Sequence, residues 1–437
     1  MTSSPLERFS GKDASEAGLR TPGAEARVTS AHVIILALGI LYALQAISPL
    51  RLDNDSVVYL HMATNIVDGL PVDSRGLPPG YPAMIALLDK AGLGYAFVFT
   101  LMNLAFFALG LASIRRLFAR SRDGALWIIA LSMLSVVFIR YIPMPQPEAM
   151  FFGVSLAAVA VMTSAISSTG KRRFLLLGIA AALTLLAITV RFVGFALLPA
   201  MLWSCFHREP SAASRRVPWS RSGKLLAAGI LIGVAAVALV FLVASFRKYS
   251  SEAALGYTHR GVVGLLVSKI DGFLWTIGEL TINIPWTRLP SYQQVFALTG
   301  LATLVAIAVM VRIKMPRTPA GIYLLSFLVV LAAWPYNAMR LWLPVVPLII
   351  GCLRNAPLRF ETGPRWRLLT RVYYAWFAIV AAAALAYTTR ITFSGKDFPR
   401  VYGKAGGMSA PDPKTGRVDT EHNERARALQ ARYGNPF

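Results

Sequence analysis

The sequence contains little cysteine, and its cysteines form no recognisable pattern. Cys205 and Cys352 are the two cysteines among 437 residues, and each lies near the end of an apolar run. Neither the spacing of a disulfide framework nor that of a cysteine–histidine metal site is present. We therefore expect each cysteine to be a small buried apolar side chain. The chain also lacks a repeat period of the kind that predicts a solenoid.

Acidic residues are scarce as well. The chain has 21 Asp and Glu against 44 Lys and Arg, a formal charge of +23. A surplus of this size can indicate a nucleic-acid partner. Here the basic residues fall mostly in short loops between apolar runs, which is the pattern of the positive-inside rule of membrane proteins. We expect no nucleic-acid partner.

Apolar residues are abundant. They make up 56% of the chain, and the mean hydropathy is +0.56, whereas soluble domains are typically about 45–50% apolar. Runs of about 20 apolar residues are long enough to cross the hydrocarbon core as helices. Eleven such segments are predicted, and the chain is therefore expected to be an all-α polytopic membrane protein. They span about 31–50, 95–118, 124–142, 147–168, 173–190, 192–206, 224–246, 292–312, 319–336, 340–354 and 372–389.

The distribution of basic residues predicts how these segments are oriented. Loops on one side hold 24 Lys and Arg, and the opposite loops hold 11 apart from the C-terminal tail. The bias predicts a cytoplasmic N-terminal tail over 1–30, a membrane domain over 31–390, outer loops over 51–94 and 247–291, and an outer C-terminal tail over 391–437. The first apolar run, His32–Leu50, starts too late for a cleavable signal peptide, so we expect it to remain as an anchor.

One apolar stretch must be divided for this topology to hold. Residues 173–206 are apolar apart from Arg191, and basic residues flank both ends. A single pass would place one basic flank outside, against the charge rule. We expect two short helices that meet near Thr189–Gly194, with Arg191 at the outer turn. There its guanidinium can reach the interface instead of lying in lipid.

The first outer loop is the most polar stretch between two apolar segments. It carries the aspartates at 53, 55, 68 and 73, with Asp89 just beyond the polar part. Apolar residues at four-residue spacing predict a short helix that ends near Asp68–Gly69 and lies along the membrane surface. In one interpretation Asp55 is simply the N-cap of that helix, a position that Asp53 or Asn54 could fill equally well. Asp68 and Asp73 are then a helix end and a turn.

Two motifs in this loop suggest a family. Asp55, Tyr59 and Ala63 have the spacing D-x3-Y-x3-A, and the sequence PPGYP follows at 78–82. The pair resembles the first extracytoplasmic loop of GT-C glycosyltransferases, in particular the bacterial branch of protein O-mannosyltransferase-like enzymes and lipid A aminoarabinose transferases. The resemblance implies a GT-C fold with Asp55 as the catalytic residue and Asp53 as the alternative. Aminoarabinose transferases carry a lysine directly before the proline pair. Here Leu77 stands there, and Arg75 is the nearest substitute.

Three later positions extend the resemblance. Glu148 opens an apolar helix after a proline-rich loop, as the second acidic residue of the family does. Arg191, with Gly194 and Pro199, resembles the arginine–glycine–proline segment of the family. Arg340 begins RLWLPVVP, which resembles its late helix start. Two alternatives stay open, because Glu148 could cap a helix and Arg340 could be an interface anchor beside aromatic residues.

The resemblance implies an inverting transfer of a sugar from polyprenyl phosphate to an extracytoplasmic lipid or envelope glycan, for example in lipopolysaccharide modification. A protein acceptor is a further alternative. A carboxylate such as Asp55 would accept the proton of the acceptor hydroxyl, and the cations Arg75, Arg191, Arg260 and Arg340 would stabilise the departing phosphate. Tyr59, Tyr81 and His259 are further candidates for substrate binding. The expected location is the bacterial inner membrane, with the site on its outer side.

We expect no required cofactor, although Asp53 and Asp55 could hold a divalent cation through their oxygens. Two other functions remain open. A transporter or flippase of lipid-linked sugars would place polar residues near the bilayer midplane at interrupted helices. A ligase or polymerase of envelope glycans would depend on the region of His259 and Arg260 more than on Asp55.

Overall fold

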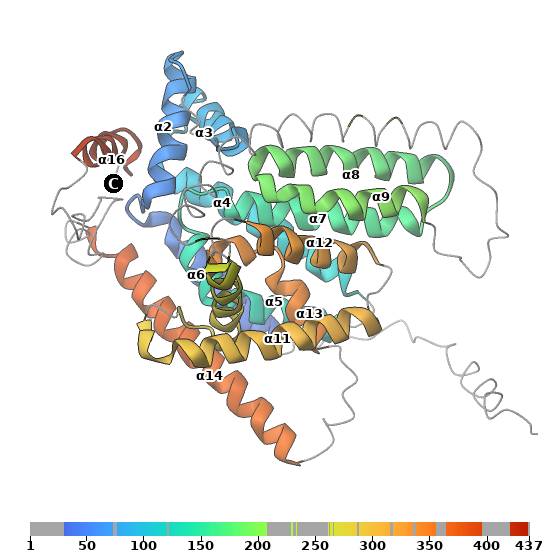
Figure 1. Ribbon diagram of the computed structural model, residues 1–437. Helices are drawn as coiled ribbons and strands as arrows, with labels where there is room; N and C mark the ends of the chain where they lie inside the picture. The colour runs from blue at the N-terminus through green and yellow to red at the C-terminus, as the bar shows by residue number, and fades with distance from the viewer. Residues whose placement is uncertain are drawn as a thin grey trace, which may run out of the picture.

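The computed structural model describes residues 30–72, 77–119, 122–207, 266–285, 288–314, 318–334, 338–354, 364–395 and 420–435, with Gly229, Gly233, Gly261, Val263 and Gly264. The ordered elements in these ranges are α and 3-10 helices, and no strand occurs among them. The expected all-α class is confirmed for this part of the chain (Figure 1).

Helix lengths show which segments can span a bilayer. Six stretches are long and apolar enough, at 30–47, 96–117, 148–166, 170–190, 290–309 and 368–392, and shorter apolar helices cover 124–133, 192–206 and 319–333. A multi-pass membrane protein is therefore supported, but the predicted count of eleven spans is not confirmed. The segment expected at 224–246 lies outside the described residues.

The labelled elements are α1 Ser30–Leu44, η2 Gln45–Ile47, α2 Asn54–Asp68, α3 Gly80–Lys90, α4 Ala96–Leu117, α5 Arg122–Met133, α6 Val136–Tyr141, α7 Glu148–Ile166, α8 Gly170–Val190, η3 Phe192–Leu197, α9 Leu198–Phe206, η5 Pro290–Tyr292, α11 Gln293–Lys314, α12 Pro319–Ala333, η6 Met339–Trp342, α13 Val346–Arg354, α14 Pro364–Thr392 and α16 Thr420–Tyr433.

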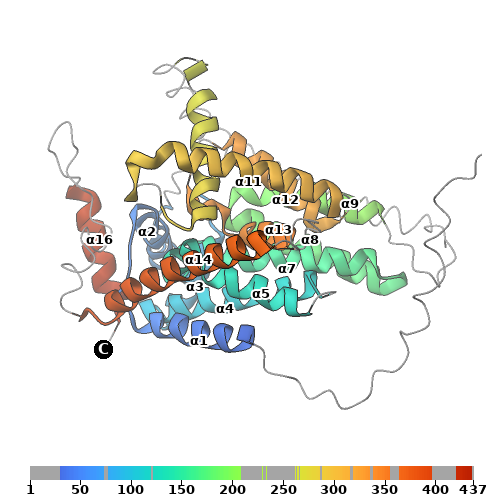
Figure 2. The same cartoon turned by 90° about the horizontal axis from the view of Figure 1, so that it is seen from below.

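Helix α7 is the centre of the bundle. In α7, 83% of the most apolar stretch is buried, whereas the corresponding share in the other five long segments is 17–44%. It packs against α4 and α8 along its length and also contacts α9 and α12. Figures 1 and 2 show these helices side by side, with α1 and α14 toward the outside. The residue that opens α7, Glu148, therefore lies at one end of the best-buried helix.

The predicted division of 173–206 is confirmed. Helix α8 ends at Val190, Arg191 is extended, and η3 and α9 follow. Helix α9 returns along α8, because the Arg173 guanidinium near the start of α8 donates to the carbonyls of Ser204, Cys205 and His207. These bonds satisfy carbonyls that the end of a helix leaves without partners. Arg191 thus lies where the chain turns back between helix α8 and helix α9.

The loop over 51–94, called the first outer loop here because it is predicted to lie outside, folds into two helices, α2 and α3, that pack on each other. Asp53 is the N-cap of α2, because its carboxylate accepts the backbone N–H of Ser56 at 2.9 Å. The interpretation of Asp55 as the N-cap is therefore wrong, and Asp55 lies in the first turn. At the other end Gly69 has φ +70°, a left-handed conformation that favours glycine.

Arg51 fixes the start of this loop. Its side chain is 2% exposed. The guanidinium donates to Gln45 Oε1 at 2.7 Å, to the carbonyl of Thr388 at 3.0 Å and to Thr392 Oγ1 at 2.8 Å. These bonds join the start of η2 to the end of α14. The chain therefore leaves the bundle at a fixed point two residues before Asp53.

The glycine of the PPGYP motif allows α3 to approach α8 closely. A Cβ atom on Gly80 would lie 2.7 Å from the backbone carbonyl oxygen of Thr189. The backbone of Thr189 cannot move aside as a flexible side chain could. A larger residue at position 80 would therefore push α3 away from α8. The motif thereby holds the first outer loop against the turn that carries Arg191.

We predict that Gly80→Ala lowers the melting temperature of the detergent-solubilised protein. The added methyl overpacks the contact with Thr189, which typically costs about 1–3 kcal/mol. Gly178→Ala is the matched control, because nothing lies within 4 Å of a Cβ atom at that helical position. The control should melt at or above the wild-type temperature. Equal melting temperatures for the two variants would contradict the close approach.

Candidate functional site

Four charged side chains gather around the guanidinium of Arg340. Its Nη1 lies 3.3 Å from Asp53 Oδ2, its Nη2 donates to Asp55 Oδ2, and its Nε lies 3.6 Å from Glu148 Oε1. Each of the three nitrogens therefore faces a different carboxylate. The fifth member is Arg191, whose Nη1 donates to the same oxygen of Glu148. This set, Asp53, Asp55, Glu148, Arg191 and Arg340, is called the charge cluster below.

The charge cluster runs from the interior to the surface. The side chain of Glu148 is 2% exposed, Arg191 is 14% and Arg340 is 19%, whereas Asp53 and Asp55 are 34% and 35% exposed. A buried carboxylate is tolerated when it is paired and hydrogen-bonded, and the two guanidiniums provide this pairing for Glu148. The half-buried aspartates form the accessible side of the cluster.

Each member lies at the start of a helix or at a break between helices. Asp53 caps α2, and Asp55 and Glu148 lie in the first turns of α2 and α7. A negative side chain is favourable at a helix N-terminus because the unpaired N–H groups there carry partial positive charge. Arg191 separates α8 from η3, and Arg340 lies in η6 after α12. Four distant parts of the sequence thus converge through helix ends.

Two alternatives from the sequence do not match this geometry. The carboxylate of Glu148 pairs with Arg191 instead of capping the helix, and Pro147 occupies the N-cap position. Arg340 contacts three carboxylates, a pairing that the interpretation as an interface anchor does not include. The aromatic residue next in line, Trp342, is also buried, at 2% exposed.

Tyr59 and Tyr81 lie beneath the cluster as a packed pair. Their ring centroids are 5.9 Å apart in an edge-to-face arrangement, and both are almost completely buried. Burial raises the pKa of Tyr59 well above its ordinary value. Tyr81 donates to Asn103 Oδ1 at 3.3 Å, and the Asn103 amide donates to the carbonyls of Ile142 and Met144. The pair therefore connects the first outer loop to the proline-rich loop before Glu148.

The sequence analysis did not single out Asn103 or Gln146. Asn103 is the one asparagine in an otherwise largely apolar segment, and such intramembrane polar residues are commonly functional or paired. Gln146 lies two residues before Glu148 and is 0% exposed. Within the described chain, neither amide atom of Gln146 has a hydrogen-bond partner, and neither has Glu148 Oε2. No spacing rule in the sequence pointed to Gln146, which stands between Pro145 and Pro147.

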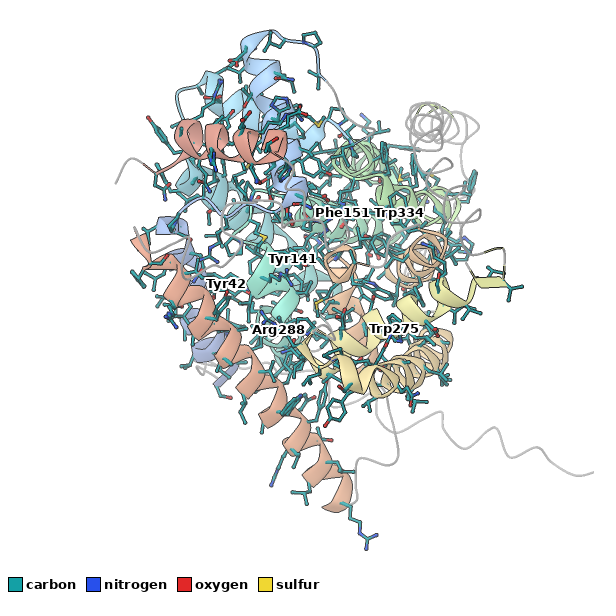
Figure 3. All side chains as sticks on the ribbon, turned by 60° about the vertical axis from the view of Figure 1, so that its left-hand side comes forward. Tyr42, Tyr141, Phe151, Trp275, Arg288 and Trp334 are labelled. Atoms are coloured by element: carbon teal, nitrogen blue, oxygen red, sulfur yellow. The ribbon has the colours of Figure 1, made fainter. Side chains whose placement is uncertain are left out.

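Three predicted site residues lie outside the described residues: Arg75, His259 and Arg260. Part of the second outer loop is described as a helix over 266–282. Lys269 of this helix donates to the carbonyl of Trp334 at 3.0 Å, and the ring of Phe273 packs against Trp342 at 5.2 Å. In Figure 3, Trp275 of this helix and Trp334 lie on the same side of the molecule. The helix therefore packs beside η6, which carries Arg340.

The described residues contain no group of three or more His, Cys, Asp or Glu arranged to hold a metal ion. The two candidate metal ligands, Asp53 and Asp55, both face Arg340. The cation that these carboxylates contact in the structure is thus a guanidinium.

No family model and no curated protein matches this chain. Among solved structures, the chain is similar to the Archaeoglobus fulgidus oligosaccharyltransferase. The form with Zn and sulfate gives a TM-score of 0.47 at 12% identity, covering 80% of this chain and 53% of that chain. The complex of this AglB protein with an inhibitory peptide and a dolichol-phosphate gives 0.43 at 13% identity, covering 92% and 61%.

The apo form gives a TM-score of 0.44 at 13% identity, covering 93% of this chain and 62% of that chain. This chain therefore spans between about half and three-fifths of the length of its structural neighbours.

We predict that Glu148→Gln destabilises the protein. The substitution keeps the shape but removes the buried negative charge beside two partly buried guanidiniums, a loss on the order of 3 kcal/mol. The measurement is the melting temperature in detergent. Glu421→Gln is the control, because Glu421 is 72% exposed and its ion pair with Arg425 lies at the surface. A wild-type melting temperature for Glu148→Gln would show that Glu148 is not needed to balance the arginines.

Proposed function

We propose that this chain is an inverting, membrane-bound glycosyltransferase that moves a sugar from polyprenyl phosphate to an acceptor hydroxyl. The observation that carries the proposal is the position of Arg340, which faces Asp55, Asp53 and Glu148 at once. The cluster provides both a carboxylate that can take a proton and guanidiniums that can bind a phosphate. The cluster also contains Asp55, Glu148, Arg191 and Arg340, the residues that the sequence motifs identify as candidates.

The reaction is a single displacement. The acceptor oxygen attacks the anomeric carbon, and the bond from that carbon to the phosphate oxygen breaks, with its electron pair leaving on the lipid phosphate. The acceptor proton passes to the carboxylate of Asp55, which acts as the general base. Attack opposite to the leaving phosphate inverts the configuration, and no covalent sugar–enzyme intermediate forms.

The two arginines have different roles in this proposal. Arg191 is held by Glu148, the most buried carboxylate of the cluster. Arg340 contacts the half-exposed aspartates and therefore lies on the accessible side of the cluster, where the lipid phosphate reaches it. A planar guanidinium can bind phosphate in a bidentate manner. As the phosphate binds Arg340, the carboxylate of Asp55 is released from this ion pair and is available to the acceptor hydroxyl. Arg75 and Arg260 would add positive charge around the same phosphate, and His259 would contribute a further contact.

Tyr59 and Tyr81 support the site from below in this proposal. Both rings are buried in the structure, so they hold α2 and α3 in position while the exposed side of the cluster meets the substrate. The substrate class follows from the scaffold, because a polyprenyl tail is soluble in lipid and an enzyme embedded in the membrane can reach its phosphate at the interface. The proposed acceptor is a lipid or an envelope glycan on the outer side of the bacterial inner membrane.

A divalent cation would be held by Asp53 and Asp55, whose oxygens are suitable hard ligands. These oxygens now face Arg340, so a metal would have to displace a guanidinium from both. The proposal therefore gives the charge-stabilising role to Arg340 and Arg191 and requires no metal.

The position of the cluster argues against a transporter. Transporters bind their substrates near the bilayer midplane, whereas this cluster lies at the ends of α7 and α8 and on the loop helix α2. A ligase or polymerase of envelope glycans remains the second candidate, favoured by the contact between the helix over 266–282 and the segment around η6.

We predict that Asp55→Asn lowers sugar transfer by at least about 10²-fold, the usual contribution of a general base. The assay measures release of polyprenyl phosphate from a panel of synthetic polyprenyl-phosphate sugars by the purified protein. Mass spectrometry of envelope glycolipids in cells expressing each variant identifies the product. Asp53→Asn should have a smaller effect, because asparagine is also a good N-cap and keeps α2 in place.

Asp271→Asn, on the helix over 266–282, is the control that should keep wild-type activity. Wild-type transfer by a folded Asp55→Asn variant would overturn the assignment of the base. Loss of transfer with Asp53→Asn but not with Asp55→Asn would move the catalytic role to Asp53. Absence of transfer by the wild-type protein from every donor in the panel would contradict the proposed function.

A further inference from the structure

The C-terminal helix α16 lies against the first outer loop. Figures 1 and 2 both show α16 beside α2, at the same end of the bundle. Its inner face consists of Ala426, Leu429 and Tyr433, which are 0%, 4% and 0% exposed. The ring of Tyr433 packs edge-on against Phe99 of α4 at 5.4 Å. A helix that is polar in composition thus buries one narrow apolar stripe on this loop.

Arg432 joins the two helices of the loop at their far ends. Its guanidinium donates to both oxygens of Asp68, at 2.9 and 3.0 Å, and to Asp89 Oδ2 at 3.0 Å. Asp68 is the last residue of α2, and Asp89 lies in the last turn of α3. Two carboxylates near one guanidinium nitrogen would repel each other without it. Arg432 therefore allows the ends of α2 and α3 to lie together.

Two further residues complete the contact. Tyr433 Oη donates to Asp89 Oδ2 at 3.0 Å and lies 3.1 Å from Thr64 Oγ1 of α2. Asn435 joins the two ends of the loop, because its amide donates to the carbonyl of Ser48 at 2.7 Å and accepts the N–H of Phe97 at 2.8 Å. Ser48 follows η2, and Phe97 lies in the first turn of α4. The last described segment, residues 420–435, thus contacts the loop at its beginning, middle and end.

We propose that residues 420–435 are a strap that positions α2, so that Asp53 and Asp55 stay on Arg340. Helix α2 is then held by a guanidinium at each end, Arg340 at its N-terminus and Arg432 at its C-terminus. Arg432, Tyr433 and Asn435 are positioning residues and do not contact the substrate. The catalytic consequence rests on the proposed function, whereas the positioning itself does not.

The physical strength of the strap comes from two sources. Exposed ion pairs contribute little individually, and Arg432 and Asp68 are 32% and 38% exposed. The buried Leu429 and Tyr433 therefore supply most of the affinity, and the hydrogen bonds of Arg432 and Asn435 set the register. The hydrogen bond from Arg432 also lowers the pKa of Asp68, so the pair remains ionised at neutral pH.

The test compares Arg432→Glu with Arg427→Glu in the full-length protein in lipid nanodiscs. Arg427 lies on the exposed side of the same helix, so the second variant changes the charge equally without touching the loop. Amide hydrogen exchange over 420–435 and 54–68 measures docking of the strap and order of α2. Arg432→Glu should speed exchange at least tenfold in both segments, and Arg427→Glu should leave both at wild-type rates.

The charge reversal provides a rescue. Asp68→Arg combined with Arg432→Glu places the guanidinium on α2, where it can pair with position 432 and with Asp89. Slow exchange should return in both segments, which a general folding defect would not allow. Unchanged exchange of 54–68 in an Arg432→Glu variant whose 420–435 segment exchanges fast would overturn the proposal.

Sugar transfer by the same three variants tests the link to catalysis. Transfer should fall about tenfold in Arg432→Glu, mainly in kcat, and recover in the rescue variant. Full transfer by a variant with disordered α2 would overturn the catalytic part of the inference. If the wild-type protein transfers no sugar, the proposed function fails, and the exchange measurement still decides whether the strap positions α2.

Discussion

The site depends on one interaction, the contact of a single guanidinium with three carboxylates. Arg340 faces Asp53 and Asp55 of the first outer loop and Glu148 of the central helix α7. Without the positive charge, three carboxylates could not lie so close at the edge of an apolar bundle. Arg191 provides a second positive charge to the most buried of them. The cluster thus contains three carboxylates and two guanidiniums.

The membrane fold explains why these groups gather at helix ends. Within a bilayer the backbone hydrogen bonds must be satisfied inside the helix, and polar side chains are costly along its length. Helix breaks have free N–H and C=O groups and lie closer to water. Arg191 lies between α8 and η3, and Glu148 follows a proline-rich turn. The polar chemistry is therefore confined to one end of an otherwise apolar bundle.

Much of the architecture could be predicted from local sequence patterns. The apolar runs predicted the long helices, and the basic flanks predicted the division of 173–206 at Arg191. The family resemblance identified Asp55, Glu148, Arg191 and Arg340 as candidate site residues, and these four side chains lie in one cluster in the structure.

Other features depend on contacts between residues far apart in the sequence, which a local pattern does not contain. The segment expected at 124–142 breaks before α6, where the Val136 N–H donates to Asn283 Oδ1 at 2.8 Å, 147 residues away. The choice of Asp53 over Asp55 as N-cap follows from backbone geometry at one residue. The contact of α16 with the ends of α2 and α3 is made by Arg432, one of 44 Lys and Arg residues, and nothing local in the sequence distinguishes it.

The most direct test of the account is the rate of sugar transfer from a polyprenyl-phosphate donor by Arg340→Lys, measured in nanodiscs beside the wild-type protein. A lysine keeps the charge but offers a compact ammonium in place of a planar group with three nitrogens. The account predicts a folded variant whose transfer rate is lower by about 10²-fold, the usual effect of losing a preorganised charge-stabilising group. Transfer at the wild-type rate by Arg340→Lys would contradict the central role of the guanidinium.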